Sequence, residues 1–140
     1  MSKSIFDDQT MFMRSCGQTV DEKNLRQFQL YYILVHEELA ELQDAVKAGN
    51  STEIFDAILD LIVVLTGAGL SAGFPMQDGW DAVWLSNMRK IDPETGTVKL
   101  REDGKILKPA GWRPPQLDKL LGEVNQNANQ QTTQGDRPQS

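Results

Sequence analysis

Apolar residues recur with a helical period over much of residues 5–91, and glycines divide the pattern into separate helices. Residues 5–16 carry a short pattern, which Gly17 ends. From Val20 a sustained stripe predicts a helix of more than about twenty residues that ends at Gly49, with Asp21 and Glu22 complementing its N-terminal dipole. The stripe consists of Leu25, Phe28, Tyr32, Val35, Leu39, Leu42 and Val46.

A second long helix is predicted after Asn50, which suits an N-cap that Glu53 completes as a capping box. It runs to about residue 72 and is apolar nearly all round after Asp60, with Gly67 and Gly69 among the small residues that allow close helix packing. Residues 73–75 break it, and a further helix follows from residue 76 or 77 to 91. One side of that helix carries Trp80, Val83, Trp84 and Asn87.

The period changes after residue 92. Residues 98–101 and 106–108 predict two short strands, and Asp103-Gly104 between them favours a type I′ turn. Residues 117–124 suit one or two helical turns, and the polar residues from 125 onward predict disorder. The pattern therefore predicts an all-α fold, a bundle of four to five helices with a short C-terminal β-hairpin. Residues 1–115 would form one domain and residues 116–140 a tail.

The charge balance narrows the possible partners. Lys and Arg number 14 against 20 Asp and Glu, and the net charge of −6 argues against a nucleic-acid or anionic-membrane binder. Cys16 is the single cysteine, so no intramolecular disulfide or CxxC zinc site can form, and we expect it in the core. The most apolar run, residues 58–72, is shorter than the roughly 20 residues of a membrane span. With no signal-peptide pattern at the N-terminus, we expect a cytoplasmic protein.

Two acidic stripes are the candidate chemistry. Glu37, Glu38 and Glu41 share one face of the first long helix, and Asp56 and Asp60 share one face of the second. Both adjoin apolar positions expected to face the core, which are Val35, Leu39 and Leu42 on one helix and Ile58, Leu61, Ile62 and Leu65 on the other. No Lys or Arg follows the three glutamates at i+4. A solvated acidic face is one interpretation, and a site for Mg²⁺ or Mn²⁺ is the other.

Several motifs together resemble one enzyme family. Glu38-Leu39-Ala40-Glu41 followed by the Asp56 to Asp60 segment resembles the ExxE…ExxD signature of the all-α nucleoside triphosphate pyrophosphohydrolases. Ser86-Asn87-Met88-Arg89-Lys90 resembles that family's Asn-x-x-Lys/Arg element, and the Asp-Gly-Lys hairpin over residues 101–108 resembles its phage and bacterial branch. The resemblance extends over about residues 5–115. The family includes MazG, dimeric dUTPase and phosphoribosyl-ATP pyrophosphohydrolase.

One position departs from the family's second motif. Ala57 stands where the family places Glu, three residues before Asp60. We take Asp60 as the motif's aspartate because the apolar run of residues 61–64 follows it, and Asp56 as the substitute for the missing Glu. Glu53, which also forms an ExxD with Asp56, is interpreted as a helix cap.

The resemblance implies a MazG-type bundle that hydrolyses a nucleoside triphosphate between the α- and β-phosphates. Two or more Mg²⁺ ions, or Mn²⁺ in their place, would be held by Glu38, Glu41, Asp56 and Asp60, while Glu37 or Glu38 accepts the proton of the attacking water. The candidates for phosphate and sugar contacts are Asn87, Lys90, Arg89, Lys105, Lys108 and Arg113, and Trp84 is a candidate for contact with the base.

The resemblance also bears on assembly and substrate. A homo-oligomer, dimer or tetramer, is implied, with sites at subunit contacts to which a neighbouring subunit would supply the lysines. Removal of altered dNTPs, removal of dCTP or dUTP, and conversion of (d)GTP to (d)GMP all stay open, with a slight lean to a purine such as (d)GTP on the phage-like resemblance alone. If a phage encodes the protein, the host cytoplasm is its expected location. Two alternatives stay open: phosphoribosyl-ATP hydrolysis in histidine synthesis, and a non-enzymatic helical adaptor with an acidic docking face.

Overall fold

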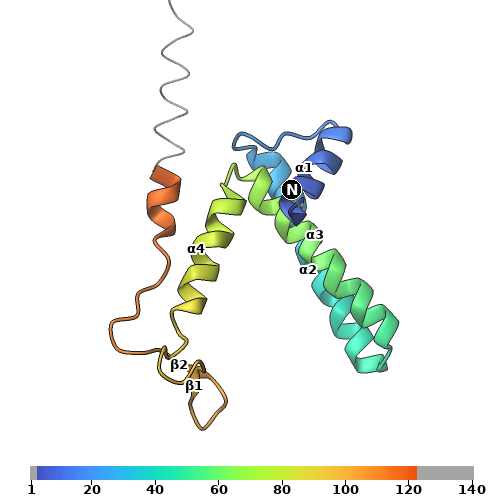
Figure 1. The fold of residues 1–140 in the computed structure, drawn as a ribbon. Helices are drawn as coiled ribbons and strands as arrows, with labels where there is room; N and C mark the ends of the chain where they lie inside the picture. Colours follow the sequence, from blue (N-terminus) through green and yellow to red (C-terminus); the bar gives the residue numbers. More distant parts are fainter. Residues whose placement is uncertain (1–2, 123–140) are drawn as a thin grey trace, which may run out of the picture. The chain divides into compact units, whose positions relative to one another are not determined.

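A computed structural model describes residues 3–122 of the chain, which divides into two units, residues 1–76 and the residues from Gln77 onward. Over the described residues the regular secondary structure is helical except for one two-stranded antiparallel hairpin, which confirms the predicted all-α class (Figure 1). Its elements are α1 (Ile5–Ser15), α2 (Leu25–Ala48), α3 (Ser51–Ser71), α4 (Met76–Met88), β1 (Lys99–Leu100), β2 (Ile106–Leu107) and a short helix over residues 117–122. The expected disorder from residue 125 concerns positions outside this range.

The turn between α2 and α3 follows from local capping chemistry. Gly49 ends α2 in the left-handed region at φ 64°, and the Asn50 side chain then accepts the Glu53 backbone N–H at 3.2 Å to begin α3. At the other end of α2, Asn24 is the N-cap and accepts the Gln27 N–H at 3.1 Å. Asp21 therefore lies ahead of the helix, contrary to expectation, and forms an exposed ion pair with Arg14 at 2.8 Å.

Helices α2 and α3 form an antiparallel hairpin that α1 covers at one end (Figure 1). The buried cluster at that end consists of Met13, Val20, Tyr31, Val64 and Leu70. Gly67 allows this packing, because a Cβ there would overlap the Tyr31 ring. The Tyr31 hydroxyl in turn donates to Gln18 at 2.6 Å, which ties α2 to the segment after α1. The predicted role of the small residues of α3 in close packing is thus confirmed at Gly67.

The buried face of α2 coincides only in part with the predicted stripe. Leu25, Tyr32, Leu39 and Val46 are exposed, and the buried residues of this helix are Tyr31 and Ala45. On α3 the expected core positions Ile58, Ile62 and Leu65 are also exposed. Phe28, Val35 and Leu42 of the stripe are partly buried, and Val35 packs against the buried cluster. The fit of Tyr31 against Gly67 therefore shifts the buried face of α2 to one side of the predicted stripe. Cys16, expected in the core, is exposed because it is the C-cap of α1.

Helix α3 is longer than the apolar run inside it because it begins at Ser51, ahead of Asp56 and Asp60. By length and composition it could cross a membrane, so the expectation that no stretch reaches that length is wrong. A core helix of a soluble protein passes the same test, and 33% of the apolar window is buried within the described structure.

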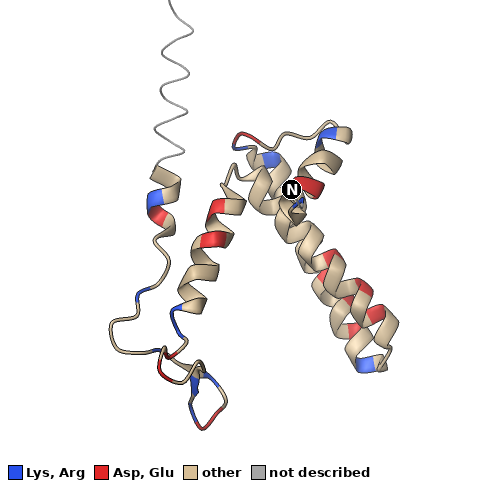
Figure 2. Cartoon of the chain, in the orientation of Figure 1, with Lys and Arg blue, Asp and Glu red and all other residues tan. Residues whose placement is uncertain are grey.

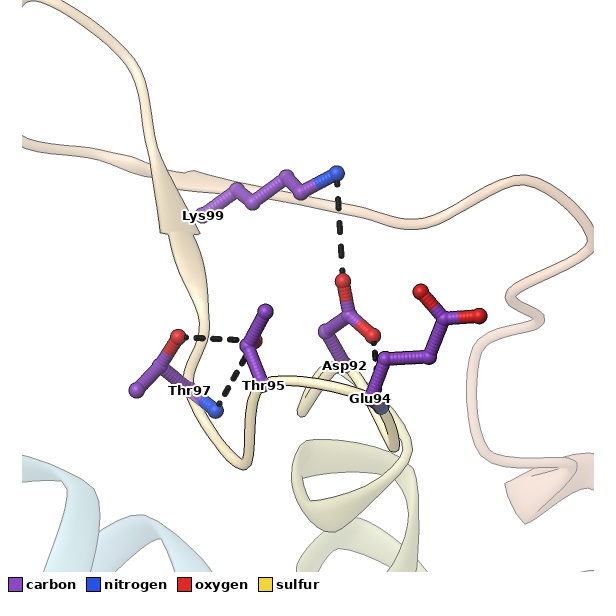
Figure 3. Close-up of polar contacts among 5 residues, drawn as sticks. All are labelled: Asp92, Glu94, Thr95, Thr97 and Lys99. Atoms are coloured by element: carbon purple, nitrogen blue, oxygen red, sulfur yellow. Dashed lines mark hydrogen bonds and ion pairs between the residues drawn. The ribbon is translucent and has the colours of Figure 1, made fainter.

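In the second unit α4 ends at Met88, earlier than the predicted residue 91, so Lys90 lies in the turn beyond the helix. Asp92 orders the next loop (Figure 3). Its backbone N–H donates to the Thr97 carbonyl at 2.9 Å, its Oδ1 accepts the Glu94 N–H at 2.9 Å, and its Oδ2 lies 3.8 Å from Lys99 Nζ. This loop leads directly into β1.

The β-hairpin forms with Lys99 opposite Leu107 and Leu100 opposite Ile106. Its turn is not the predicted type I′, which requires positive φ at both central residues. The Gly104 N–H donates to the Arg101 carbonyl at 2.9 Å, and among the described residues only glycines have positive φ, with Gly104 at 80°. Beyond the strands the Arg101 N–H donates to the Lys105 carbonyl at 2.7 Å, so residues 102–104 form the turn, with Gly104 in the left-handed region at its third position.

Candidate active site

The α2–α3 hairpin places the two acidic stripes beside each other. Acidic residues gather along the half of the hairpin that leads to the turn at Gly49 (Figure 2). The pKa of Glu38 is raised above its ordinary value, first by loss of solvent around the carboxylate and then by repulsion from four neighbouring carboxylates. Those neighbours, in order of decreasing effect, are Glu41, Asp60, Asp56 and Glu37. Carboxylates of α2 and α3 thus act on one group.

One oxygen of Glu38 lacks a compensating partner. The side chain is partly exposed, but Oε2 has almost no solvent contact and accepts no hydrogen bond from the described residues. An enclosed carboxylate oxygen without a donor, next to further acids, is electrostatically unfavourable. A hard divalent cation prefers carboxylate oxygens and would relieve both the missing hydrogen bond and the repulsion. The donor set therefore fits Mg²⁺ or Mn²⁺.

The side chains have not converged into a coordination sphere. Over residues 3–122, no three His, Cys, Asp or Glu side chains are grouped closely enough to hold a metal ion. Asp56, unlike Glu53, is among the carboxylates that raise the Glu38 pKa, while the Glu53 N–H bonds to the Asn50 cap. His36, next to the acids in sequence, packs edge-on against the Tyr32 ring at 4.8 Å between centroids. Metal binding would thus require rotation of the carboxylates.

The basic candidates of the second unit gather around a residue that the sequence did not single out. Lys90 Nζ donates to Asn87 Oδ1 at 2.8 Å and lies 5.2 Å from the centre of the Trp112 ring. Lys108 Nζ lies 4.5 Å from the same ring centre. The indole Nε1 of Trp112 donates to the Ser86 carbonyl at 2.8 Å. Asn87 and Lys90, predicted from one motif, and Lys108, predicted from the hairpin, therefore share one neighbourhood.

The side chains of the remaining predicted residues have no contact in this group, which Arg113 joins through its carbonyl, an acceptor of the Ser86 hydroxyl at 3.4 Å. Arg89, Lys105 and Arg113 are exposed, and Trp84 is 52% exposed on α4. Lys105 takes part in the hairpin through its backbone, whose N–H donates to Asp103 Oδ1 at 3.1 Å. A signal for Trp112 was present in the sequence, since a single aromatic in a Pro- and Gly-rich segment needs a partner surface for its ring and its N–H.

The first unit thus carries carboxylates on a pair of helices, and the second carries Asn87 and Lys90 at the end of α4. The sequence model of the family described as phosphoribosyl-ATP pyrophosphohydrolase matches residues 14–87, just over half of the chain. The chain belongs to this family, which is part of the MazG-like nucleoside triphosphate pyrophosphohydrolase superfamily. The matched range includes both acidic stripes and ends at Asn87. No curated protein matches the chain.

Proposed function

We propose that the protein is a Mg²⁺-dependent pyrophosphohydrolase that converts a (deoxy)nucleoside triphosphate, with a purine such as (d)GTP favoured, to the monophosphate and pyrophosphate. Membership of the family supports the reaction class. The observation that carries the metal dependence is the enclosed, unpartnered Oε2 of Glu38 beside the other carboxylates of the hairpin. A purely structural acidic face would leave its oxygens in water.

The proposed roles follow from position and exposure. Glu38, Glu41, Asp56 and Asp60 would hold the metal, because each of the other three acts on Glu38 electrostatically. Bound Mg²⁺ supplies charge neutralisation of the triphosphate and a more acidic water. Glu37 is exposed beside them and is the candidate to accept the proton of the attacking water. Asn87 and Lys90, already joined by a hydrogen bond, would bind phosphate oxygens.

Phosphoribosyl-ATP is the second candidate substrate, and the description of the matched family favours it. The bond cleaved is of the same kind, so the carboxylates would have the same roles. The hairpin and the tryptophans of α4 resemble the phage-like branch, which is why we place a (d)NTP first. The two substrates differ in the ribosyl phosphate attached to the base, and direct comparison of turnover separates them.

We also propose that the protein is a homo-oligomer, with dimer and tetramer both open. The apolar residues next to the carboxylates on the hairpin are solvent-exposed in the single chain, and large exposed patches of this kind mark interaction surfaces. They include Leu39, Ile58, Ile62 and Leu65. The apolar character of α3 on several sides has the same explanation, because another subunit's helices would cover it.

The decisive assay is pyrophosphate release from canonical and damaged NTPs and dNTPs and from phosphoribosyl-ATP, each with Mg²⁺. We expect Glu41→Gln and Asp60→Asn to abolish turnover while thermal melting stays near wild type or rises, since loss of a charge relieves repulsion. Asp44→Asn is the matched control, because Asp44 lies on the same helix but is not among the carboxylates that raise the Glu38 pKa. It should keep wild-type turnover.

Isothermal titration with Mg²⁺ and a non-hydrolysable dNTP analogue tests the adaptor alternative. Absence of metal-dependent binding would remove the enzyme proposal and leave an acidic docking face. Equal turnover of all substrates would refute the proposed preference for a purine (d)NTP and leave the proposed reaction standing. A large loss of helicity in Glu41→Gln or Asp60→Asn would assign those residues a structural role instead.

A further inference from the structure

The segment that carries Trp112 is held against the end of α4 by defined contacts. The backbone N–H of Trp112 donates to the Pro109 carbonyl at 3.1 Å, which closes a turn. Gly111 at the third position of this turn has φ 79°, a positive value that such a turn requires. The indole N–H then reaches the carbonyl of Ser86, a buried residue in the last turn of α4. Carbonyls in a last helical turn lack intrahelical donors, so the indole satisfies one of them.

Two ammonium groups adjoin this anchored ring. Lys90 comes from the turn after α4 and Lys108 from the residue after β2, and their Nζ atoms lie 5.2 Å and 4.5 Å from the ring centre. The π-face attracts each cation by about 0.5–1 kcal/mol at exposed sites. Two like charges beside one ring also repel each other, and an anion between them would remove that repulsion.

The carboxylates nearby do not neutralise these lysines. Elsewhere in the unit, Lys99 pairs with Asp92 at 3.8 Å and Arg101 with Asp103 at 3.4 Å. Within the described range neither Lys90 nor Lys108 has a carboxylate within ion-pair distance. The only hydrogen-bond partner of the Lys90 ammonium there is the neutral oxygen of Asn87. Donors of both ammonium groups therefore remain available to a ligand.

We propose that the indole of Trp112 gathers Lys90 and Lys108 into one binding site for the polyphosphate chain of the substrate. Trp112 is a positioning residue in this site. Its indole N–H fixes it to α4, and its ring attracts Lys90, which precedes β1 in the sequence, and Lys108, which follows β2. The inference rests on the proposed function for the identity of the substrate, but the anion site itself does not require hydrolysis.

The test is binding of inorganic tripolyphosphate to the full chain at low salt without divalent metal, where the acids of the α2–α3 hairpin cannot hold the probe through a cation. Lys108→Gln should weaken binding about tenfold, because a charge-assisted contact is lost. Trp112→Leu should weaken it roughly fivefold, and Trp112→Phe, which retains a π-face, should weaken it less. Lys99→Gln is the matched control, because Lys99 is also a hairpin lysine but pairs with Asp92 (Figure 3), and it should bind like wild type.

Kinetics with the nucleotide substrate give the second measurement. Lys108→Gln and Trp112→Leu should raise KM and leave kcat nearly unchanged, because the contact stabilises the bound substrate and the transition state alike. Equal tripolyphosphate binding by wild type, Lys108→Gln and Lys90→Gln would overturn the inference, and these two lysine variants decide the case if Trp112→Leu does not fold. Lysine-dependent tripolyphosphate binding without pyrophosphate release from any nucleotide would refute the proposed function and leave the anion site standing.

Discussion

Gly67→Ala probes the contact that determines how α2 and α3 pack. A Cβ at this position would overlap three atoms of the Tyr31 ring, Cε1, Cδ1 and Cζ. The ring cannot move away freely, because Tyr31 is only 5% exposed and its hydroxyl is bonded to Gln18 at 2.6 Å. The added methyl must therefore displace the helix or break that hydrogen bond.

Three effects determine how much Gly67→Ala changes the free energy of unfolding. Overpacking a core costs about 1–3 kcal/mol, and loss of the Tyr31 hydrogen bond would add about 0.5–1.5 kcal/mol. Replacing a helical glycine returns only about 0.5–1 kcal/mol of backbone entropy. We expect a net loss of about 1–3 kcal/mol in the free energy of unfolding, which for a chain of this size lowers Tm by about 3–10 °C.

Thermal melting at fixed protein concentration measures this, because the Tm of an oligomer depends on concentration. Gly79→Ala is the matched control: its Cβ would meet no described atom within 4 Å, so its Tm should rise slightly. Tyr31→Phe releases the ring from Gln18, so Gly67→Ala should cost less in that background than in wild type. A Tm for Gly67→Ala at or above wild type, with the expected rise in Gly79→Ala, would refute the packing argument.

Two further predictions concern the acidic stripes and the exposed apolar face. The pKa of Glu38 is raised above its ordinary 4.5, so the folded state binds more protons than the unfolded state between those two values and stability falls as pH rises through that window. Without metal, Glu38→Gln should have a higher Tm than wild type at neutral pH, and this Tm difference should disappear below the ordinary pKa of the carboxyl. A constant Tm difference from about pH 4 to pH 8 would contradict the raised pKa of Glu38. Ile62→Glu, at a position that is 42% exposed in the single chain, should lower the solution mass measured by light scattering. An unchanged oligomer would place the interface elsewhere.

Local chemistry made much of the fold predictable from the sequence. Gly49 and Asn50 end one helix and begin the next through contacts within four residues, so their roles were readable without any partner. The spacing of Glu38 and Glu41, and of Asp56 and Asp60, likewise defined two acidic stripes before the helices were paired. The family match includes both stripes and agrees with the resemblance they predicted.

Contacts between residues far apart in the sequence decided which helix faces are buried and which side chains surround Trp112. The Tyr31–Gly67 fit joins positions on two helices, and it buried Tyr31, which lies beside the stripe that the apolar period selected on α2. Trp112 meets Ser86, Lys90 and Lys108 only because a turn and a hairpin fold back to the end of α4, so the sequence predicted both lysines without their common neighbour. Helical periodicity and capping are properties of a few consecutive residues. Which faces pack together, and which charges converge, depends on side chains that meet only in the folded chain.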